Sequence, residues 1–303
     1  MKNRKIKKEL LLLSLALVCL SGCGNTGEPD KLGNDQVSLS VRSASLQQLF
    51  TRASSNLESG SIGVFLASDN GYTAQNNVEY TYNAGWSTST PILLGNNQAS
   101  VCAYYPYSAS VTDASSVALG SGVYSLANDL CYASTQQFNN ESSDWEIAMS
   151  RAYSQISLNV TRDASYMGAC AISSVKIANA GLYGSATLNI ATGEYANPMV
   201  SEVSYDPEIA SIGAGATVTT SALVVPVGSA MSGDLLISLV VDGVSLSAQV
   251  DVSANNLTLL QAGTRYVLNL NVAGESLLIG GVSVTDWNVN EIPGSTDLLP
   301  SNE

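Results

Sequence analysis

Cysteine and arginine are the side chains through which this sequence could do distinctive chemistry, because histidine is absent. Its absence excludes Ser-His-Asp and Cys-His nucleophiles and every metal site that uses an imidazole ligand. A two-carboxylate hydrolase would still be allowed, but no motif points to one. We therefore expect no enzymatic activity, no catalytic residue, no cofactor and no metal.

Cys23 has the clearest context of the five cysteines. The chain begins with a basic segment, and an apolar run over residues 10–20 follows, which is shorter than the ~20 residues of a membrane-spanning helix. The motif LSGC then ends at Cys23. This pattern resembles the signal peptide of bacterial lipoproteins, whose cysteine is acylated after cleavage. It predicts a signal peptide over residues 1–22, lipidation of Cys23 and a flexible tether over residues 23–35.

Three more cysteines lie in the body of the chain: Cys102, Cys131 and Cys170. An odd number in an exported protein leaves at least one unpaired. Cys102 and Cys131 could form a disulfide if their strands are neighbours. We favour the alternative that all three are small, buried apolar side chains.

Arginine is rare in the first half of the chain. Arg42 and Arg52 are the only basic residues between Lys31 and Arg151. Around Arg52, residues 47–61 lose the alternation of a strand and are rich in small polar side chains, a composition typical of exposed backbone that proteases cut. A protease specific for arginine would therefore have very few sites here.

Alternation of apolar and polar residues predicts strands along most of the chain. Residues 36–46 place Val37, Leu39 and Val41 on one face of a strand whose other face is polar. Such a strand would bury its three apolar side chains in a core.

Hairpins complete this pattern. Asp242-Gly243 between two apolar runs predicts a two-residue turn, and residues 264–272 and 277–284 predict a closing hairpin. No long amphipathic helix interrupts the strands, so we predict an all-β fold built of sandwiches.

The division of the chain follows from its composition. A polar, acidic link over residues 138–144 separates two regions rich in predicted strands. We predict two tandem β-sandwich domains, over residues 36–146 and 147–287, and a polar C-terminal tail over residues 288–303.

The net charge of the chain limits which macromolecules it is expected to bind. The chain has 12 Lys and Arg against 25 Asp and Glu, a formal net charge of −13. Nucleic acid is excluded as a partner because its phosphates require a basic surface.

Several short motifs, in order, resemble the fimbrillin-like lipoproteins of the Bacteroidales. They are TRA at residues 51–53, GSIGVFL at 60–66, VCAYYPY at 101–107 and, after AGTRYVLNLNV, VSVTDW at 282–287. The resemblance covers roughly residues 37–287. It implies two transthyretin-like β-sandwich domains.

The same resemblance implies a function. Members of the fimbrillin-like family are structural or adhesive subunits of a cell-surface fimbria (pilus). The resemblance implies that this chain, like them, is anchored in outer-membrane lipid through a cysteine, which here is Cys23. An Arg-specific maturation protease removes the first strand, and a strand of another fimbrial subunit replaces it by β-augmentation. The resemblance does not identify the host or bacterial surface ligand.

Carried over to this sequence, the removable strand contains Val37, Leu39 and Val41. The protease would cut between Arg52 and Ala53, with Arg42 as the second choice.

The tail is a poor donor strand. It contains few apolar residues, and Pro293 and Pro300 cannot donate backbone hydrogen bonds. Either residues 282–292 are exchanged instead, or this subunit accepts a strand without donating one, as would suit a tip or accessory position.

An alternative function is that of a surface glycan-binding lipoprotein. It would share the lipid anchor and the sandwiches, and it would need tyrosines or Trp86, Trp145 and Trp287 exposed as a flat binding platform.

Overall fold

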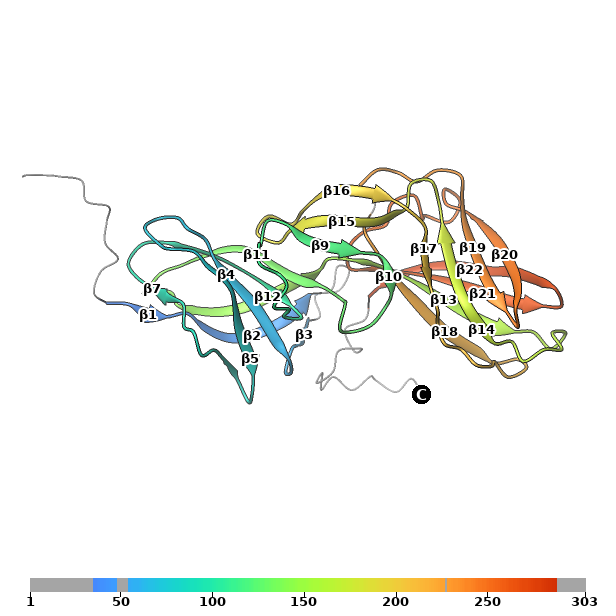
Figure 1. Ribbon diagram of the computed structural model, residues 1–303, viewed down its shortest axis with the longest axis horizontal. Helices are drawn as coiled ribbons and strands as arrows, with labels where there is room; N and C mark the ends of the chain where they lie inside the picture. The colour runs from blue at the N-terminus through green and yellow to red at the C-terminus, as the bar shows by residue number, and fades with distance from the viewer. Residues whose placement is uncertain (1–34, 48–53, 227, 288–303) are drawn as a thin grey trace, which may run out of the picture. The chain divides into compact units, whose positions relative to one another are not determined.

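The computed structural model describes residues 35–47, 54–226 and 228–287. Within these residues it contains 22 strands and no helix, which confirms the all-β fold. The strands form five sheets (Figure 1).

Eight strands form the first sheet, in the order β3-β2-β12-β11-β8-β4-β5-β6. Strands β2 and β6 are not paired with each other but lie in contact, so the sheet curls around a core. Trp145, Ile147 and Met149 from β12 and Ile62 and Val64 from β4 are buried in this core. The bounds are β2 (Ser40–Gln47), β3 (Ser54–Asn56), β4 (Ser61–Leu66), β5 (Gln75–Tyr82), β6 (Trp86–Ser87), β8 (Ala99–Tyr105), β11 (Cys131–Phe138) and β12 (Asp144–Arg151).

Two further sheets enclose a second core. Their strand orders are β10-β18-β13-β21-β22 and β17-β14-β19-β20. Ile156, Leu158, Leu239 and Leu268 are among its fully buried side chains. The bounds are β10 (Gly122–Val123), β13 (Ser154–Arg162), β14 (Ile172–Ala178), β17 (Val203–Tyr205), β18 (Thr217–Val224), β19 (Asp234–Val241), β20 (Val244–Asp251), β21 (Thr264–Ala273) and β22 (Ser276–Asp286).

Two small sheets complete the fold. One has the order β16-β15-β9 and the other pairs β1 with β7. Strands β9 and β10 follow β8 of the first sheet in the chain, yet they pair with β15 and β18, which come much later. A third core forms where these segments meet the outer face of β4 and β8. The bounds are β1 (Val37–Ser38), β7 (Leu93–Leu94), β9 (Val117–Gly120), β15 (Tyr183–Asn189) and β16 (Glu194–Val200).

Both predicted hairpins are confirmed. Strands β19 and β20 pair from Val241 and Val244 outwards, and Asp242 and Gly243 between them have φ angles of 48° and 81°. Positive φ at both positions is the requirement of a tight two-residue turn. Strands β21 and β22 form the closing hairpin along their whole length.

The predicted boundary between residues 146 and 147 falls inside β12. Ile147, Ala148 and Met149 of β12 pair with β2 of the first sheet. By contact, the described residues belong to one compact unit. We retain two sandwich domains as a proposal and place the boundary after Arg151, between β12 and β13.

All three cysteines described are free and buried, as we favoured. Cys102 contributes to the third core and Cys131 to the first, so their side chains lie on opposite faces of one sheet. This arrangement keeps the two sulfur atoms apart and explains the absence of a disulfide between them.

Candidate functional site

Strand β2 lies between two other strands. One, β12, is about 100 residues later in the chain, and the other, β3, follows β2 after a short segment. Strand β2 pairs in parallel with β12, from Ser40 beside Asp144 to Leu46 beside Met149, and antiparallel with β3 on its other edge. In Figure 1 the blue β2 lies alongside the green β12. Removal of β2 would therefore leave a slot one strand wide along β12, bordered by β3 at the end where residues 45–47 lay.

The inner face of β2 is apolar and buried. Leu39, just before the strand, and Val41, Ala44 and Leu46 within it are each no more than 5% exposed. Burial of a Val or Leu side chain contributes about 1.5–3 kcal/mol, so the three larger side chains together contribute roughly 5–9 kcal/mol. Strand β2 is thus a large part of the first core.

Val37 is not buried with these side chains, so the prediction that it lies on the buried face of the strand is wrong. Its side chain is 42% exposed, and it lies in β1, which pairs with β7. The predicted single strand over residues 36–46 is interrupted at Leu39, whose N–H donates to the carbonyl of Ile92 at 2.8 Å. The pairing with β12 also shifts register between Val41 and Ser43, which moves Ala44 and Leu46 onto the buried face.

Further hydrogen bonds join β2 to its surroundings. The N–H of Ser40 donates to the carbonyl of Ser143 at 2.8 Å, and the N–H of Leu57 donates to the carbonyl of Ala44 at 2.7 Å. The Tyr80 hydroxyl donates to the carbonyl of Leu39 at 3.2 Å. These partners would lose their hydrogen bonds if β2 were removed.

Arg42 lies in the middle of β2 and points to solvent. Its guanidinium binds the Asp144 carboxylate at 2.9 and 3.0 Å, and both side chains are more than half exposed. The hydrogen bond to Asp144 raises the pKa of Arg42. Its backbone falls at the register shift between β2 and β12, between the paired residues Val41 and Ser43, and β3 pairs only with residues 45–47.

The other residues predicted for processing lie outside the described part of the chain. These are Cys23, Arg52, Ala53 and the tail. Strand β2 ends at Gln47 and β3 begins at Ser54, so Arg52 falls in the connection between them.

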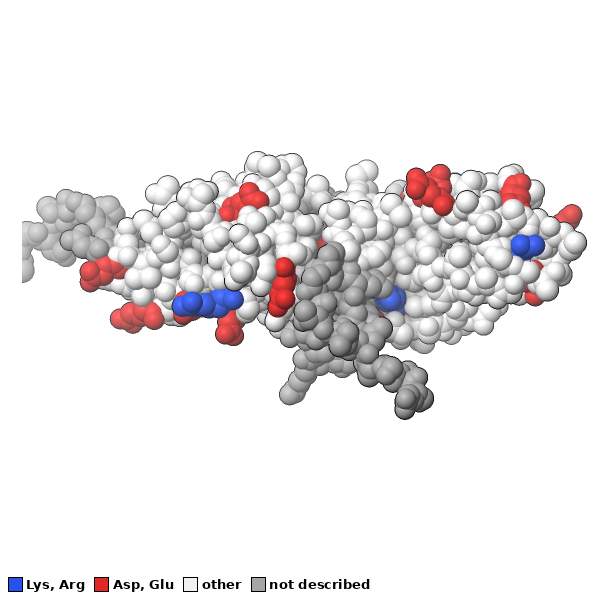
Figure 2. All heavy atoms as spheres, turned by 90° about the horizontal axis from the view of Figure 1, so that it is seen from below, with Lys and Arg blue, Asp and Glu red and all other residues white. Residues whose placement is uncertain are grey.

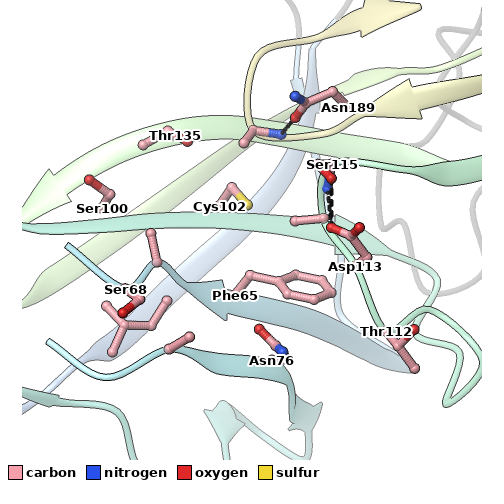
Figure 3. A pocket seen from close by; sticks show the side chains of 15 residues that line it. Phe65, Ser68, Asn76, Ser100, Cys102, Thr112, Asp113, Ser115, Thr135 and Asn189 are labelled. Atoms are coloured by element: carbon pink, nitrogen blue, oxygen red, sulfur yellow. Dashed lines mark hydrogen bonds between the residues drawn. The ribbon is translucent and has the colours of Figure 1, made fainter. Parts of the chain in front are cut away.

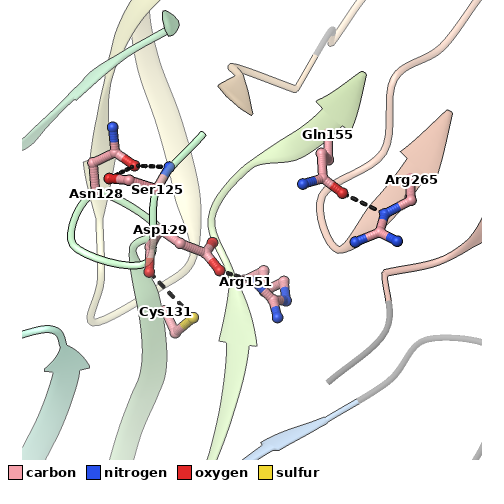
Figure 4. Close-up of polar contacts among 7 residues, drawn as sticks. All are labelled: Ser125, Asn128, Asp129, Cys131, Arg151, Gln155 and Arg265. Carbon is pink, nitrogen blue, oxygen red and sulfur yellow. Dashed lines mark hydrogen bonds and ion pairs between the residues drawn. The ribbon is translucent and has the colours of Figure 1, made fainter. Parts of the chain in front are cut away.

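A second polar centre lies at the end of β12, around Arg151 (Figure 4). Asp129 and Arg151 are each 4% exposed and form an ion pair. The Arg151 guanidinium lies over the Trp287 ring, 4.1 Å from its centroid, and Tyr124 meets the same ring edge-on at 5.6 Å. Sequence reasoning missed this cluster, because Asp129, Tyr124 and Trp287 are far from Arg151 in the chain and no local pattern joins them.

The three tryptophans are buried or packed against the protein's own cores. Trp145 and Trp287 are 1% and 2% exposed, and Trp86 packs against the first core. Trp145 contacts Phe138 and Trp287 contacts Arg151, so both rings have structural partners. The tryptophans therefore do not provide the exposed platform that the glycan-binding alternative would require.

Acidic side chains are distributed over the visible surface, and basic ones are few (Figure 2). Within the described ranges no group of three or more Cys, Asp or Glu residues could hold a metal ion. In the same ranges, no helix is long and apolar enough to cross a membrane.

Comparison with known proteins places these features in a family. Residues 51–287 match the family described as fimbrillin-like. A comparison with curated proteins found no match.

Two crystal structures illustrate the likeness of fold, both of proteins with a suggested role in cell adhesion. The one from Bacteroides uniformis ATCC 8492 is 18% identical, with a TM-score of 0.62 over 84% of this chain and 100% of that one. The one from Bacteroides ovatus ATCC 8483 is 16% identical, with a TM-score of 0.61 over 84% and 99%. At these identities the likeness shows the fold, and the match over residues 51–287 shows that the chain belongs to the fimbrillin-like family.

Proposed function

We propose that this protein is a structural or adhesive subunit of a cell-surface fimbria that accepts a β-strand from another subunit. Membership of the fimbrillin-like family supports the fimbrial role. The single observation that supports strand acceptance is the position of β2 in a slot between β3 and β12, with its apolar face in the first core.

The driving force for exchange is the exposed slot. Loss of β2 would uncover one edge of β12, one edge of β3 and the apolar trough below Leu39, Val41 and Leu46. Unpaired backbone groups and exposed apolar surface are both unfavourable until another strand covers them. An extended segment with alternating apolar side chains would fit there.

We propose that an Arg-specific protease releases β2 by cutting between Arg52 and Ala53. Proteases bind an extended, accessible backbone. Arg42 lies within β2, where its neighbours Val41 and Ser43 pair with β12 and its guanidinium is bound by Asp144. We favour Arg52 over Arg42 because the sequence around Arg52 loses the alternation of a strand and is rich in small polar residues.

The export route is part of the same proposal. Acylation of Cys23 would hold the subunit at the outer membrane until cleavage frees everything from Ala53 onwards. The tail, residues 288–303, remains a poor donor by its sequence, so we propose a tip or accessory subunit that accepts a strand without donating one.

The test is digestion of the chain without its lipid, residues 24–303, by an Arg-specific protease. We expect a new N-terminus at Ala53 by intact mass, and loss of this product in Arg52→Ala but not in Arg42→Ala. Cleavage at Arg42 in the wild type, or an unchanged product in Arg52→Ala, would contradict the assignment.

Strand acceptance is tested separately with the cleaved protein. A synthetic peptide of residues 36–47 should bind it and raise its unfolding temperature, whereas the same peptide with Leu39→Asp should not. Failure of the wild-type peptide to bind a folded, cleaved protein would exclude an open slot.

A further inference from the structure

A hollow of about 520 Å³ lies on the outer face of the first sheet, away from β2. Strands β4, β8 and β11 supply its floor, and two loops, residues 112–115 and 189–191, supply one wall (Figure 3). Binding sites for small molecules commonly have volumes of about 300–1,000 Å³ and lie where separate packing units meet. This hollow satisfies both conditions.

The wall is held in place by backbone hydrogen bonds. The N–H of Ile190 donates to the carbonyl of Ala114, and the N–H of Thr135 donates to the carbonyl of Ala191, each at 2.9 Å. The side-chain oxygen of Asn189 accepts from the N–H of Ala191 at 3.0 Å. The hollow is therefore formed before any ligand arrives, which lowers the entropy lost on binding.

The floor is apolar and the rim is polar. The Phe65 ring and the Cys102 thiol lie at the base in Figure 3. Asn76, Thr112 and Thr135 line the hollow, and within the described residues their side chains have no hydrogen-bond partner. These amide and hydroxyl groups can both donate and accept hydrogen bonds. They are therefore available to a ligand whose own groups also donate and accept hydrogen bonds.

Charge narrows the class of ligand. The lining contains no lysine or arginine, and Asp113 is its only carboxylate. Hydrogen bonds from the N–H and hydroxyl of Ser115, both 2.8 Å long, lower the pKa of Asp113 and keep it anionic. A phosphate, sulfate or sugar acid would meet a negative charge here with no cation to offset it.

The thiol does not add reactive or metal-binding chemistry. Burial raises the pKa of Cys102 to about 12, so the sulfur stays protonated at neutral pH. A protonated thiol is neither a good nucleophile nor a metal ligand. It acts as part of the apolar floor.

We propose that this hollow binds a neutral saccharide, of the size of one or two sugar rings. The apolar face of a sugar ring would lie toward Phe65 and Cys102, and its hydroxyls would exchange hydrogen bonds with Asn76, Thr112, Thr135 and the Asp113 carboxylate. The site shares no lining residue with β2 or β12. Saccharide binding therefore does not depend on strand exchange, and either proposal can fail without the other.

Saturation-transfer difference NMR on residues 24–303 tests the proposal. The probes are glucose, galactose, mannose, N-acetylglucosamine and lactose, with glucuronic acid and N-acetylneuraminic acid as anionic counterparts. We expect transfer to at least one neutral sugar and none to the two acids. Transfer to no neutral sugar, or stronger transfer to an acid, would overturn the proposal.

Matched variants place the ligand in the hollow. Thr135→Trp should fill the space and reduce transfer to background, whereas Thr285→Trp, an exposed position of β22, should leave it unchanged. Asn76→Ala removes a polar group without adding bulk and should weaken binding by about 3- to 10-fold, as expected for a lost hydrogen bond. Equal transfer in Thr135→Trp and Thr285→Trp, or unchanged affinity in Asn76→Ala, would overturn the assignment.

Discussion

Asp242 is the side chain that organises the loop between β13 and β14. Its carboxylate accepts hydrogen bonds from the N–H groups of Ala171 and Cys170, both at 2.9 Å, and from the Tyr166 hydroxyl at 2.8 Å. The bond from Ala171, followed by that from Tyr166, lowers the pKa of Asp242 below its usual value of 3.8. The charged carboxylate therefore favours the folded loop.

We predict that this contribution depends on pH. Because the folded-state pKa is the lower one, the stabilisation is present above pH 3.8 and is lost as the pH falls through the folded-state pKa. Asp242→Asn keeps a residue that tolerates the positive φ of 48° but removes the charge. It should lower stability at pH 7 and flatten the pH dependence below pH 4, as measured by urea unfolding.

A suitable control is Glu275→Gln, an exposed carboxylate in the turn between β21 and β22. It removes a carboxylate charge away from the loop between β13 and β14 and should leave the stability at pH 7 unchanged. If Asp242→Asn and Glu275→Gln behaved alike, Asp242 would not be the group responsible.

At the scale of elements, β2 determines whether the first core is complete. Leu39 is 3% exposed in the core, whereas Val37, two residues earlier, is 42% exposed. The two positions are therefore suited to a comparison of substitutions, because they are two residues apart and one side chain is buried while the other is exposed.

We predict that Leu39→Asp destabilises the uncleaved protein by about 3–5 kcal/mol, since it buries a carboxylate and removes apolar contacts. Val37→Asp should cost less than about 0.5 kcal/mol, as for most surface changes. Urea unfolding at pH 7 measures both. Equal effects would mean that β2 does not occupy its slot in solution.

At the scale of the whole molecule, Asp129, Arg151, Tyr124 and Trp287 connect strands of different sheets. Arg151 ends β12 of the first sheet, and Trp287 follows β22 of the second group of sheets. Another polar contact lies within the second group, where Arg265 of β21 donates to Gln155 of β13 (Figure 4). The first cluster thus contributes to stability across the boundary that we place after Arg151.

We predict that Arg151→Ala destabilises the protein by about 3–5 kcal/mol, because it leaves the Asp129 carboxylate buried without its partner. The double variant Asp129→Asn with Arg151→Met removes both charges and should recover most of that loss. Chemical denaturation compares the two. A double variant as unstable as Arg151→Ala would show that the ion pair itself, rather than the unpaired charge, accounts for the effect.

Most individual strands were predictable because they depend on neighbouring residues. Alternation located β21 and β22. Asp242-Gly243 specified the turn between β19 and β20, because a two-residue turn with positive φ depends only on the residues that form it. The motifs that led to the family are local as well, and the family match over residues 51–287 confirms them. Burial of the three cysteines followed from their chemistry.

The sequence by itself determined an all-β chain, its main hairpins, its family and its acidic composition. Only the tertiary structure decided that Val37 is exposed, that β12 extends to Arg151, and that β9 and β10 pair with β15 and β18. It also decided the hollow below the two loops and the contact of Arg151 with Trp287. The physical reason is distance along the chain: each of these features joins segments that are far apart in sequence, and alternation within one strand does not encode its partner.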